Sequence, residues 1–172
     1  MKKRQFFPDQ HVKSALDVKA EELIEKGIRG LILDIDNTLE PYFVPDPGKA
    51  VKDWIQTLKE AGLKLYIVSN GKEARVKRFN RHLQLRYICH AGKPGSGGFL
   101  KAVEEFKLPH AQIAVIGDQI FTDVWGGNRL GMYTILARQV SPKVEWITAV
   151  KRPLEKIVLF FYRRSLKKHK KA

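Results

Sequence analysis

Cysteine is almost absent from the 172-residue sequence, in which Cys89 is the single example. A lone cysteine excludes an internal disulfide framework and indicates a reducing compartment. Cys89 lies in the run RYICH and is expected to pack as a small hydrophobic residue. Long apolar runs are also missing, so we expect no transmembrane helix. The start, MKKRQFFPD, loses its apolar character at Pro8 and is not typical of a signal peptide.

Acidic residues are scarce relative to basic ones. The chain has 18 Asp and Glu against 32 Lys and Arg, which gives a formal net charge of +14. This excess indicates an anionic partner such as a nucleic acid, an anionic lipid or a phosphorylated substrate, unless the basic surface only aids solubility. Hydrophobic residues make up 44% of the chain, enough for a packed core. Neither a repeat nor a Pro-rich linker divides the sequence, so we expect one domain over 1–172.

Short continuous apolar runs alternate with amphipathic helical patterns. The runs lack the alternation of half-exposed strands and are typical of parallel strands buried on both faces. They lie at 31–34, 64–69, 86–90, 113–117 and 132–137. The helices are expected at 47–61, 72–83 and 97–106, with a short one after Asp123. This order predicts an α/β fold, a Rossmann-like three-layer sandwich with a mostly parallel sheet of about five strands.

Unusual polar residues follow the predicted strands. They are Asp34 and Asp36 after 31–34, Ser69 and Asn70 after 64–69, Lys93 in the loop after 86–90, and Asp118 and Asp123 after 113–117. Ligands of open parallel sheets bind at the carboxyl ends of the strands. Since right-handed crossovers bring those ends to one edge, we expect the four loops to converge there.

Several carboxylates at one edge would repel one another unless a cation compensates their charge. Mg²⁺ meets this need because it favours oxygen ligands and retained waters. Lys93 and Ser69 could neutralise and hydrogen-bond the oxygens of a phosphoryl group. A central aspartate could attack phosphorus in line and form an acyl phosphate. The residues therefore predict a magnesium-dependent site for phosphoryl chemistry.

Four segments match known motifs in order along the chain. They are DIDNT at 34–38, IVSNG at 67–71, GKPG at 92–95 and GDQIFTD at 117–123. Together they resemble the motifs of the haloacid dehalogenase superfamily over roughly residues 28–140. One such motif is weak evidence, but four in order, each after a predicted strand or in its loop, are specific. The segments EPYFVPDP and GDQIFTDVWGGNRLG further resemble the phosphatidylglycerophosphate phosphatase branch.

The resemblance implies a role for each acidic residue. Asp34 would be the nucleophile that accepts the phosphoryl group. Asp36 would protonate the leaving oxygen and then act as the base for water, while its backbone carbonyl ligates Mg²⁺. Asp118 would ligate the metal directly, and Asp123 would support the metal shell. Taken singly, an aspartate at a strand end is also a common turn former or helix cap.

The same resemblance assigns the remaining motif residues to the phosphate. Thr38 would position the first loop beside the phosphate, and Ser69 and Asn70 would bind its oxygens. Lys93 would hold the nucleophile and the phosphoryl oxygens together. The structural alternatives are a simple turn at Ser69–Asn70 and a solvated lysine at 93.

The spaces where related enzymes carry a cap domain are short. Only about ten residues, LEPYFVPDPG, separate Thr38 from the next predicted helix, and 71–93 holds one helix and one strand. A folded domain usually needs on the order of 50 residues, so we expect no cap domain. An open site suits a phosphate presented on a membrane lipid, a protein or a nucleic acid.

The C-terminal segment 151–172 reads KRPLEKIVLFFYRRSLKKHKKA, with nine Lys or Arg and one Glu. One interpretation is a basic tail at a membrane surface, with aromatic residues in the interface and cations at anionic head groups. MKKRQFF at the other end has a similar composition. The alternatives are that IVLFFY packs on the core while the end is solvated, or that the tail binds RNA.

Together these observations predict a magnesium-dependent phosphatase that forms an aspartyl phosphate and dephosphorylates phosphatidylglycerophosphate. We expect a cytoplasmic protein, with peripheral attachment to the inner face of the membrane as an option. One alternative is a phosphatase for soluble sugar or nucleotide phosphates. Another is a phosphorylatable signalling domain, against which Asp36 argues because a second carboxylate promotes attack by water. A third is a nucleic-acid- or ribosome-associated protein with a vestigial site.

Overall fold

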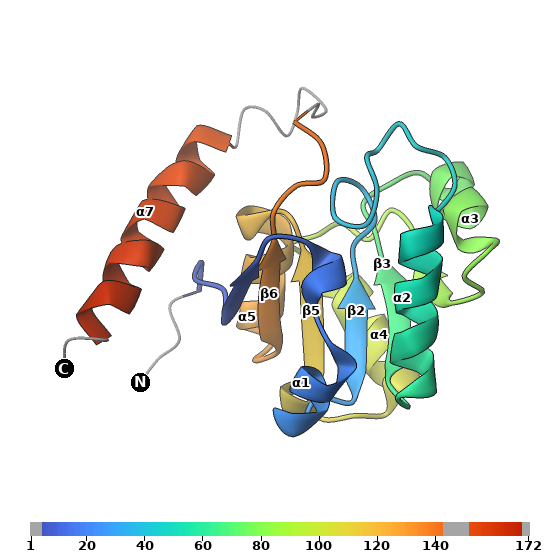
Figure 1. Ribbon diagram of the computed structural model, residues 1–172, viewed down its shortest axis with the longest axis horizontal. Coiled ribbons are helices and arrows are strands. Elements are labelled where there is room, and N and C mark those ends of the chain that lie inside the picture. Colours follow the sequence, from blue (N-terminus) through green and yellow to red (C-terminus); the bar gives the residue numbers. More distant parts are fainter. Residues whose placement is uncertain (1–4, 143–151, 170–172) are drawn as a thin grey trace.

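The structure, a computed structural model, describes residues 5–142 and 152–169. Its centre is a sheet of six parallel strands in the order β1-β6-β5-β2-β3-β4 (Figure 1). The strands are β1 (Gln10–Val12), β2 (Gly30–Leu33), β3 (Lys64–Val68), β4 (Arg86–Ile88), β5 (Ile113–Gly117) and β6 (Tyr133–Ala137). The predicted α/β sandwich is therefore confirmed.

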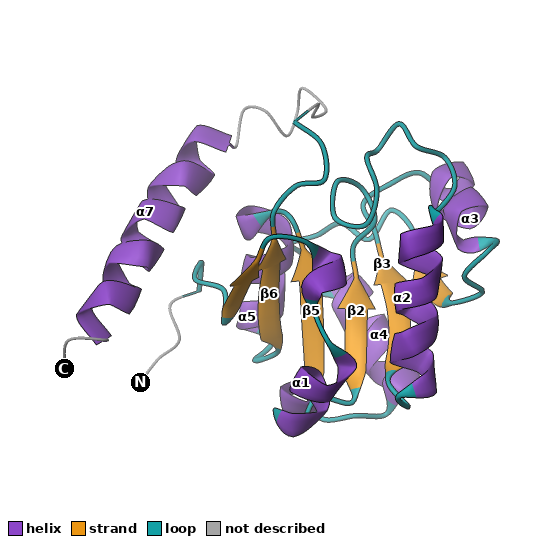
Figure 2. Cartoon of the chain, viewed as in Figure 1, coloured by secondary structure: helices purple, strands orange, loops and turns teal. Residues whose placement is uncertain are grey.

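Helices cover both faces of this sheet (Figure 2). The α-helices are α1 (Ala20–Glu25), α2 (Lys49–Glu60), α3 (Glu73–Asn80), α4 (Gly97–Phe106), α5 (Trp125–Arg129) and α7 (Arg152–His169). Short 3-10 turns lie at Ala15–Asp17 and His110–Gln112, and a π-helical turn at Ile120–Val124 leads into α5. The four helices predicted before residue 130 are confirmed within a few residues at their ends.

The two faces of the sheet are built from alternate residues of each strand. Leu31 and Leu33 of β2 pack in the core layer that contains α1, α2 and α3. Ile32, between them, packs on the opposite face with Phe99 and Phe106 of α4. Because successive side chains of a strand point to opposite faces, a continuous apolar run is required where both faces are covered. Cys89 packs against the first of these layers, as expected.

One strand was not predicted. β1 is a three-residue edge strand that pairs with β6, with Gln10 opposite Ile135. Its sequence, QHV, has no apolar run because an edge strand of this length needs little burial. The sheet therefore has six strands rather than about five, and every pairing within it is parallel.

The C-terminal helix α7 lies beside the β1–β6 side of the sheet (Figure 1). Val158 and Leu159 pack against the cluster that contains Ile120, and the ring of Tyr162 lies 5.5 Å from that of Phe7. Part of IVLFFY thus packs on the core, as one alternative expected, while other residues of this run stay exposed. Among the helices of the described ranges, none carries an apolar stretch long enough to span a bilayer. Residues 1–4 and 170–172 of the basic ends lie outside those ranges.

Strand register brings the polar loops to one edge. Leu33 pairs with Ile67 of β3 and with Ile116 of β5, so the three strands end at the same level. The connections above that level are the loops from β2 to α2, from β3 to α3 and from β4 to α4, and the π-helical turn after β5.

Candidate active site

The loop after β2 folds back over its own first residue. The Asp34 N–H continues the sheet by donating to the Ile116 carbonyl at 3.0 Å. The Ile35 carbonyl then accepts from the N–H groups of Thr38 (3.1 Å) and Leu39 (2.9 Å), which closes a tight turn. As a result, the Thr38 hydroxyl donates to Oδ2 of Asp34 at 2.8 Å. This turn fixes the orientation of the Asp34 carboxylate.

Lys93 lies between two carboxylates. Its Nζ is 2.7 Å from Oδ1 of Asp34 and 2.6 Å from Oδ1 of Asp123, and its side chain is 3% exposed. Asn70 holds the lysine loop in place, since its Oδ1 accepts from the Lys93 N–H (2.8 Å) and its Nδ2 donates to the Lys93 carbonyl (3.1 Å). The loop after β3, which carries Asn70, therefore positions Lys93 of the loop after β4 against Asp34, which follows β2.

Burial and charge act in opposite directions on this lysine and its partners. Burial lowers the pKa of Lys93, but the charges of Asp123 and Asp34 outweigh it and hold the pKa above its ordinary value. The two carboxylates therefore favour the charged form of Lys93. Burial raises the pKa of Asp123 to about 6, against the lowering effect of Lys93 and with a further increase from the Asp34 charge.

Three buried carboxylates form an acidic triad, which we define as Asp34, Asp118 and Asp123. One oxygen from each lies within 4.8 Å of the others. The Thr38 hydroxyl is 3.3 Å from Oδ1 of Asp118, and Gln139 Nε2 donates to its Oδ2 at 3.0 Å. Three carboxylates and one ammonium leave two negative charges uncompensated when all are ionised. A divalent cation with oxygen ligands fits this donor set in charge and chemistry.

Gly117 allows the triad to form. A Cβ at this position would lie 2.1 Å from Cγ of Asp123, far closer than real contacts. Asp123 therefore packs directly over the backbone that precedes Asp118. A side chain at residue 117 would displace Asp123 from Lys93.

The carboxylate of Asp36 is bound by an arginine of α3. Arg75 of α3 donates from Nε to Oδ1 of Asp36 at 3.1 Å, and Nη1 donates to the Pro45 carbonyl at 2.9 Å. Oδ2 of Asp36 and Oγ of Ser69 each lie 3.1 Å from where a Cβ at Gly71 would stand. The second carboxylate of the DxD motif thus faces the loop after β3, held by an arginine.

The structure brings the predicted residues to one edge, where two of them also brace the loops. The Ser69 hydroxyl accepts from the Gly71 N–H at 3.0 Å, so it braces its own turn. The Asn70 side chain is engaged with the Lys93 backbone. Phosphate binding by Ser69 and Asn70 stays a prediction. Sequence reasoning missed Arg75 and Gln139, because no motif contains them and their partners are distant in sequence.

Comparison with known proteins identifies the family. A profile of the haloacid dehalogenase-like hydrolases matches residues 45–131, which include Ser69, Lys93, Asp118 and Asp123. The chain belongs to this family. The family predicted from the sequence is thereby confirmed.

Two curated relatives refine the placement within the haloacid dehalogenase-like hydrolases. The chain is 40% identical over 159 residues to a protein named probable phosphatase YqeG of Bacillus subtilis, covering 92% of each. It is 26% identical over 178 residues to phosphatidylglycerophosphate phosphatase 1, chloroplastic/mitochondrial, of Arabidopsis thaliana, covering 98% of this chain and 51% of that protein. The predicted enzyme class, a phosphatase of this family, is confirmed.

A solved structure supports the fold. The putative 3-deoxy-D-manno-octulosonate 8-phosphate phosphatase from Vibrio cholerae superposes with a TM-score of 0.50 at 16% identity, covering 57% of this chain and 61% of that one. At this identity the similarity concerns the arrangement of strands and helices.

Proposed function

We propose that this phosphatase transfers the phosphoryl group of its substrate to Asp34 and then to water. The contact of Lys93 Nζ with Asp34 at 2.7 Å is the observation that carries this proposal. A buried cation beside the nucleophile stabilises the charge that builds up on the phosphoryl oxygens. The Thr38 hydroxyl, bonded to Oδ2 of Asp34, orients the carboxylate for in-line attack.

The two half-reactions use the two carboxylates of the DxD motif. In the first, an Asp34 oxygen bonds to phosphorus while the bond from phosphorus to the alcohol oxygen breaks, and Asp36 gives that oxygen its proton. In the second, Asp36 takes a proton from water, which attacks phosphorus and releases inorganic phosphate from Asp34. Arg75, bonded to Asp36 at 3.1 Å, holds this acid–base group in place.

We propose Mg²⁺ as the cofactor. Asp34 and Asp118 would hold it together with the Asp36 carbonyl, and Asp123 would support that shell. The bound ion would neutralise phosphoryl charge during transfer. The buried acidic triad, with its two uncompensated charges, supports this assignment.

We propose phosphatidylglycerophosphate as the substrate. The relative in Arabidopsis that carries this name supports the assignment, as do the short connections around the site, which leave room for a large phosphorylated molecule. The purified protein should be assayed on this lipid in mixed micelles and on soluble sugar and nucleotide phosphates, with Asp34→Asn as the inactive control. High turnover of a sugar phosphate without turnover of the lipid would reject the substrate but keep the phosphatase.

We also propose that α7 rests on an anionic membrane surface. Its outward stripe consists of exposed apolar residues, namely Leu154, Ile157, Phe160 and Phe161, each more than half exposed. These residues recur at the spacing of one helical face. Exposed Lys156 and Arg164 on the same helix would meet anionic head groups.

Vesicle binding tests the role of the outward stripe. Phe160→Ser combined with Phe161→Ser should reduce sedimentation with vesicles that contain phosphatidylglycerol. Leu100→Ser, an exposed apolar residue of α4, is the matched control and should bind as the parent does. Equal binding of all three proteins would exclude α7 as the contact surface. Binding to RNA but not to vesicles would favour the nucleic-acid alternative.

A further inference from the structure

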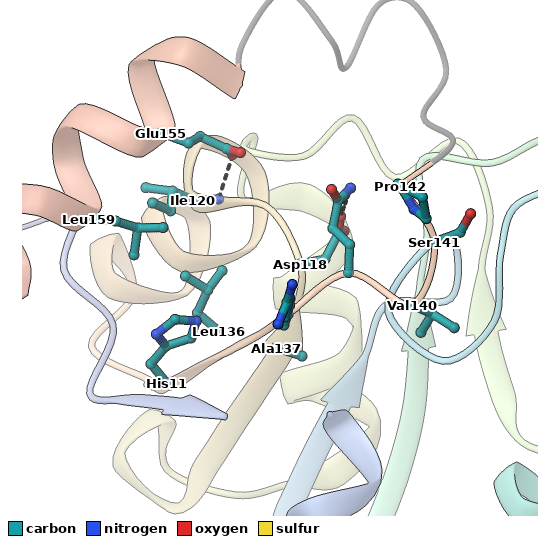
Figure 3. Close-up of a pocket in the computed structure, with 12 residues that line it drawn as sticks. His11, Asp118, Ile120, Leu136, Ala137, Val140, Ser141, Pro142, Glu155 and Leu159 are labelled. Carbon is teal, nitrogen blue, oxygen red and sulfur yellow. Dashed lines mark hydrogen bonds between the residues drawn. The ribbon is translucent and has the colours of Figure 1, made fainter. Parts of the chain in front are cut away.

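A cavity of about 810 Å³ lies beside the acidic triad. Asp118 forms part of its wall, so the cavity adjoins the proposed reaction centre. In Figure 3, Glu155 and Leu159 of α7 lie on one side of Asp118, and the segment 140–142 lies on the other. The volume falls within the range of small-molecule sites.

The C-terminal helix closes one side of this cavity. Leu159 packs with Ile120 and Leu136 into an apolar wall. Oε1 of Glu155, a buried residue, accepts from the Ile120 N–H at 2.9 Å (Figure 3). This bond ties the first turn of α7 to the π-helical turn that carries Asp123. The helix is therefore a wall of the cavity as well as an external surface.

The lining of the cavity includes an arginine, Arg138. Arg138 follows β6 directly, and its backbone N–H donates to the Val12 carbonyl at 3.0 Å, which fixes its position at the sheet edge. Within residues 5–142 and 152–169, no carboxylate forms an ion pair with its guanidinium. The cavity thus combines an apolar wall and several polar side chains with an exposed arginine that is available to a ligand.

We propose that this cavity holds the alcohol part of the phosphomonoester and that Arg138 binds a second anionic group on it. This inference rests on the proposed phosphatase function and adds to it a residue that recognises the substrate. An anionic group gains charge-assisted hydrogen bonds from the guanidinium. A short aliphatic backbone between two phosphates matches both parts of the cavity.

Two soluble substrates of the full-length protein test the assignment. Glycerol 3-phosphate has no second anionic group, whereas the alcohol part of glycerophosphoglycerol phosphate carries a phosphodiester. Arg138→Gln should lower kcat/KM for the second substrate about 10- to 100-fold, mainly through KM, as expected for a lost charge-assisted hydrogen bond. Its effect on glycerol 3-phosphate should be small. The matched control is Arg86→Gln, an exposed arginine of β4 at the opposite edge of the sheet, which should change neither substrate.

Inhibition gives a readout that does not depend on turnover of the probe. Glycerophosphoglycerol has no phosphomonoester, and it should compete with substrate in the parent and about tenfold less well in Arg138→Gln. An assay on phosphatidylglycerophosphate in mixed micelles distinguishes a lipid substrate from a soluble phosphate ester. A higher kcat/KM than that of the soluble head group, with the same dependence on Arg138, identifies the lipid; the reverse order identifies a soluble ester.

The two proposals fail in different ways. Equal effects of Arg138→Gln on both soluble substrates, or no effect on either, would overturn the cavity assignment while the phosphatase stands. Absence of turnover on every phosphomonoester would overturn the proposed function and the cavity assignment with it.

Discussion

Replacing Lys93 by methionine should destabilise the metal-free protein and lower the kcat of the enzyme assayed with Mg²⁺. The ammonium lies 2.7 Å and 2.6 Å from the carboxylates of Asp34 and Asp123, in a side chain that is 3% exposed. Methionine preserves most of the volume but leaves two buried carboxylates uncompensated. Removal of one partner of a buried ion pair costs about 3–5 kcal/mol of unfolding free energy. The chemical step should lose at least about 10²–10³-fold in kcat, the range for one transition-state donor.

The assay is urea denaturation in EDTA, followed by tryptophan fluorescence, at pH 5 and pH 8. At pH 5 the variant should recover part of its stability, because the orphaned carboxyl groups can take up protons there. Lys101→Met, an exposed lysine of α4, is the matched control and should lie within about 0.5 kcal/mol of the parent. Parent-like stability of Lys93→Met at both pH values would refute the buried ion-pair account.

Further predictions concern the residues around Lys93. The folded pKa of Asp123, about 6 against 3.8, means that its proton stabilises the fold below pH 4 and that this contribution is lost as pH rises through 6. At about 1.4 kcal/mol per pKa unit, the unfolding free energy should fall by up to about 3 kcal/mol over this pH range. The metal-free Asp123→Asn variant should lack this decline in denaturant titrations. A pH profile equal to that of the parent would contradict the raised pKa of Asp123. Gly117→Ala should cost about 1–3 kcal/mol in the same titrations and lower kcat, because its Cβ overlaps Asp123. Arg75→Leu should lower kcat about tenfold or more through misplacement of Asp36, whereas Arg78→Leu on the same helix should have little effect; equal rates would show that Arg75 is dispensable.

The sheet could be predicted because its strands are buried on both faces. A strand such as 113–117 must be apolar throughout when helices cover it on both sides, and its bounds matched those of β5. β1 was not predicted because a three-residue edge strand has no continuous apolar run. The orientation of α7 also escaped, since the run at 157–162 has apolar residues on two faces and only the structure separates the inward from the outward ones.

The site could be predicted as a set of loops but not as a set of contacts. The order of DIDNT, IVSNG, GKPG and GDQIFTD along a parallel sheet implies convergence at one edge. The pairing of Arg75 with Asp36 joins a helix face to a loop 39 residues away. The residue spacing within a motif cannot predict such a contact. The same holds for Gln139 and Asp118, which are 21 residues apart.

Acid quenching of the enzyme during turnover, followed by peptide mass spectrometry, tests the central claim most directly. Covalent chemistry at the end of β2 predicts one phosphoryl group on the peptide that contains Asp34, labile to hydroxylamine and absent from Asp34→Asn. Turnover that proceeds with no phosphorylated peptide, or with the phosphoryl group on another residue, would contradict it.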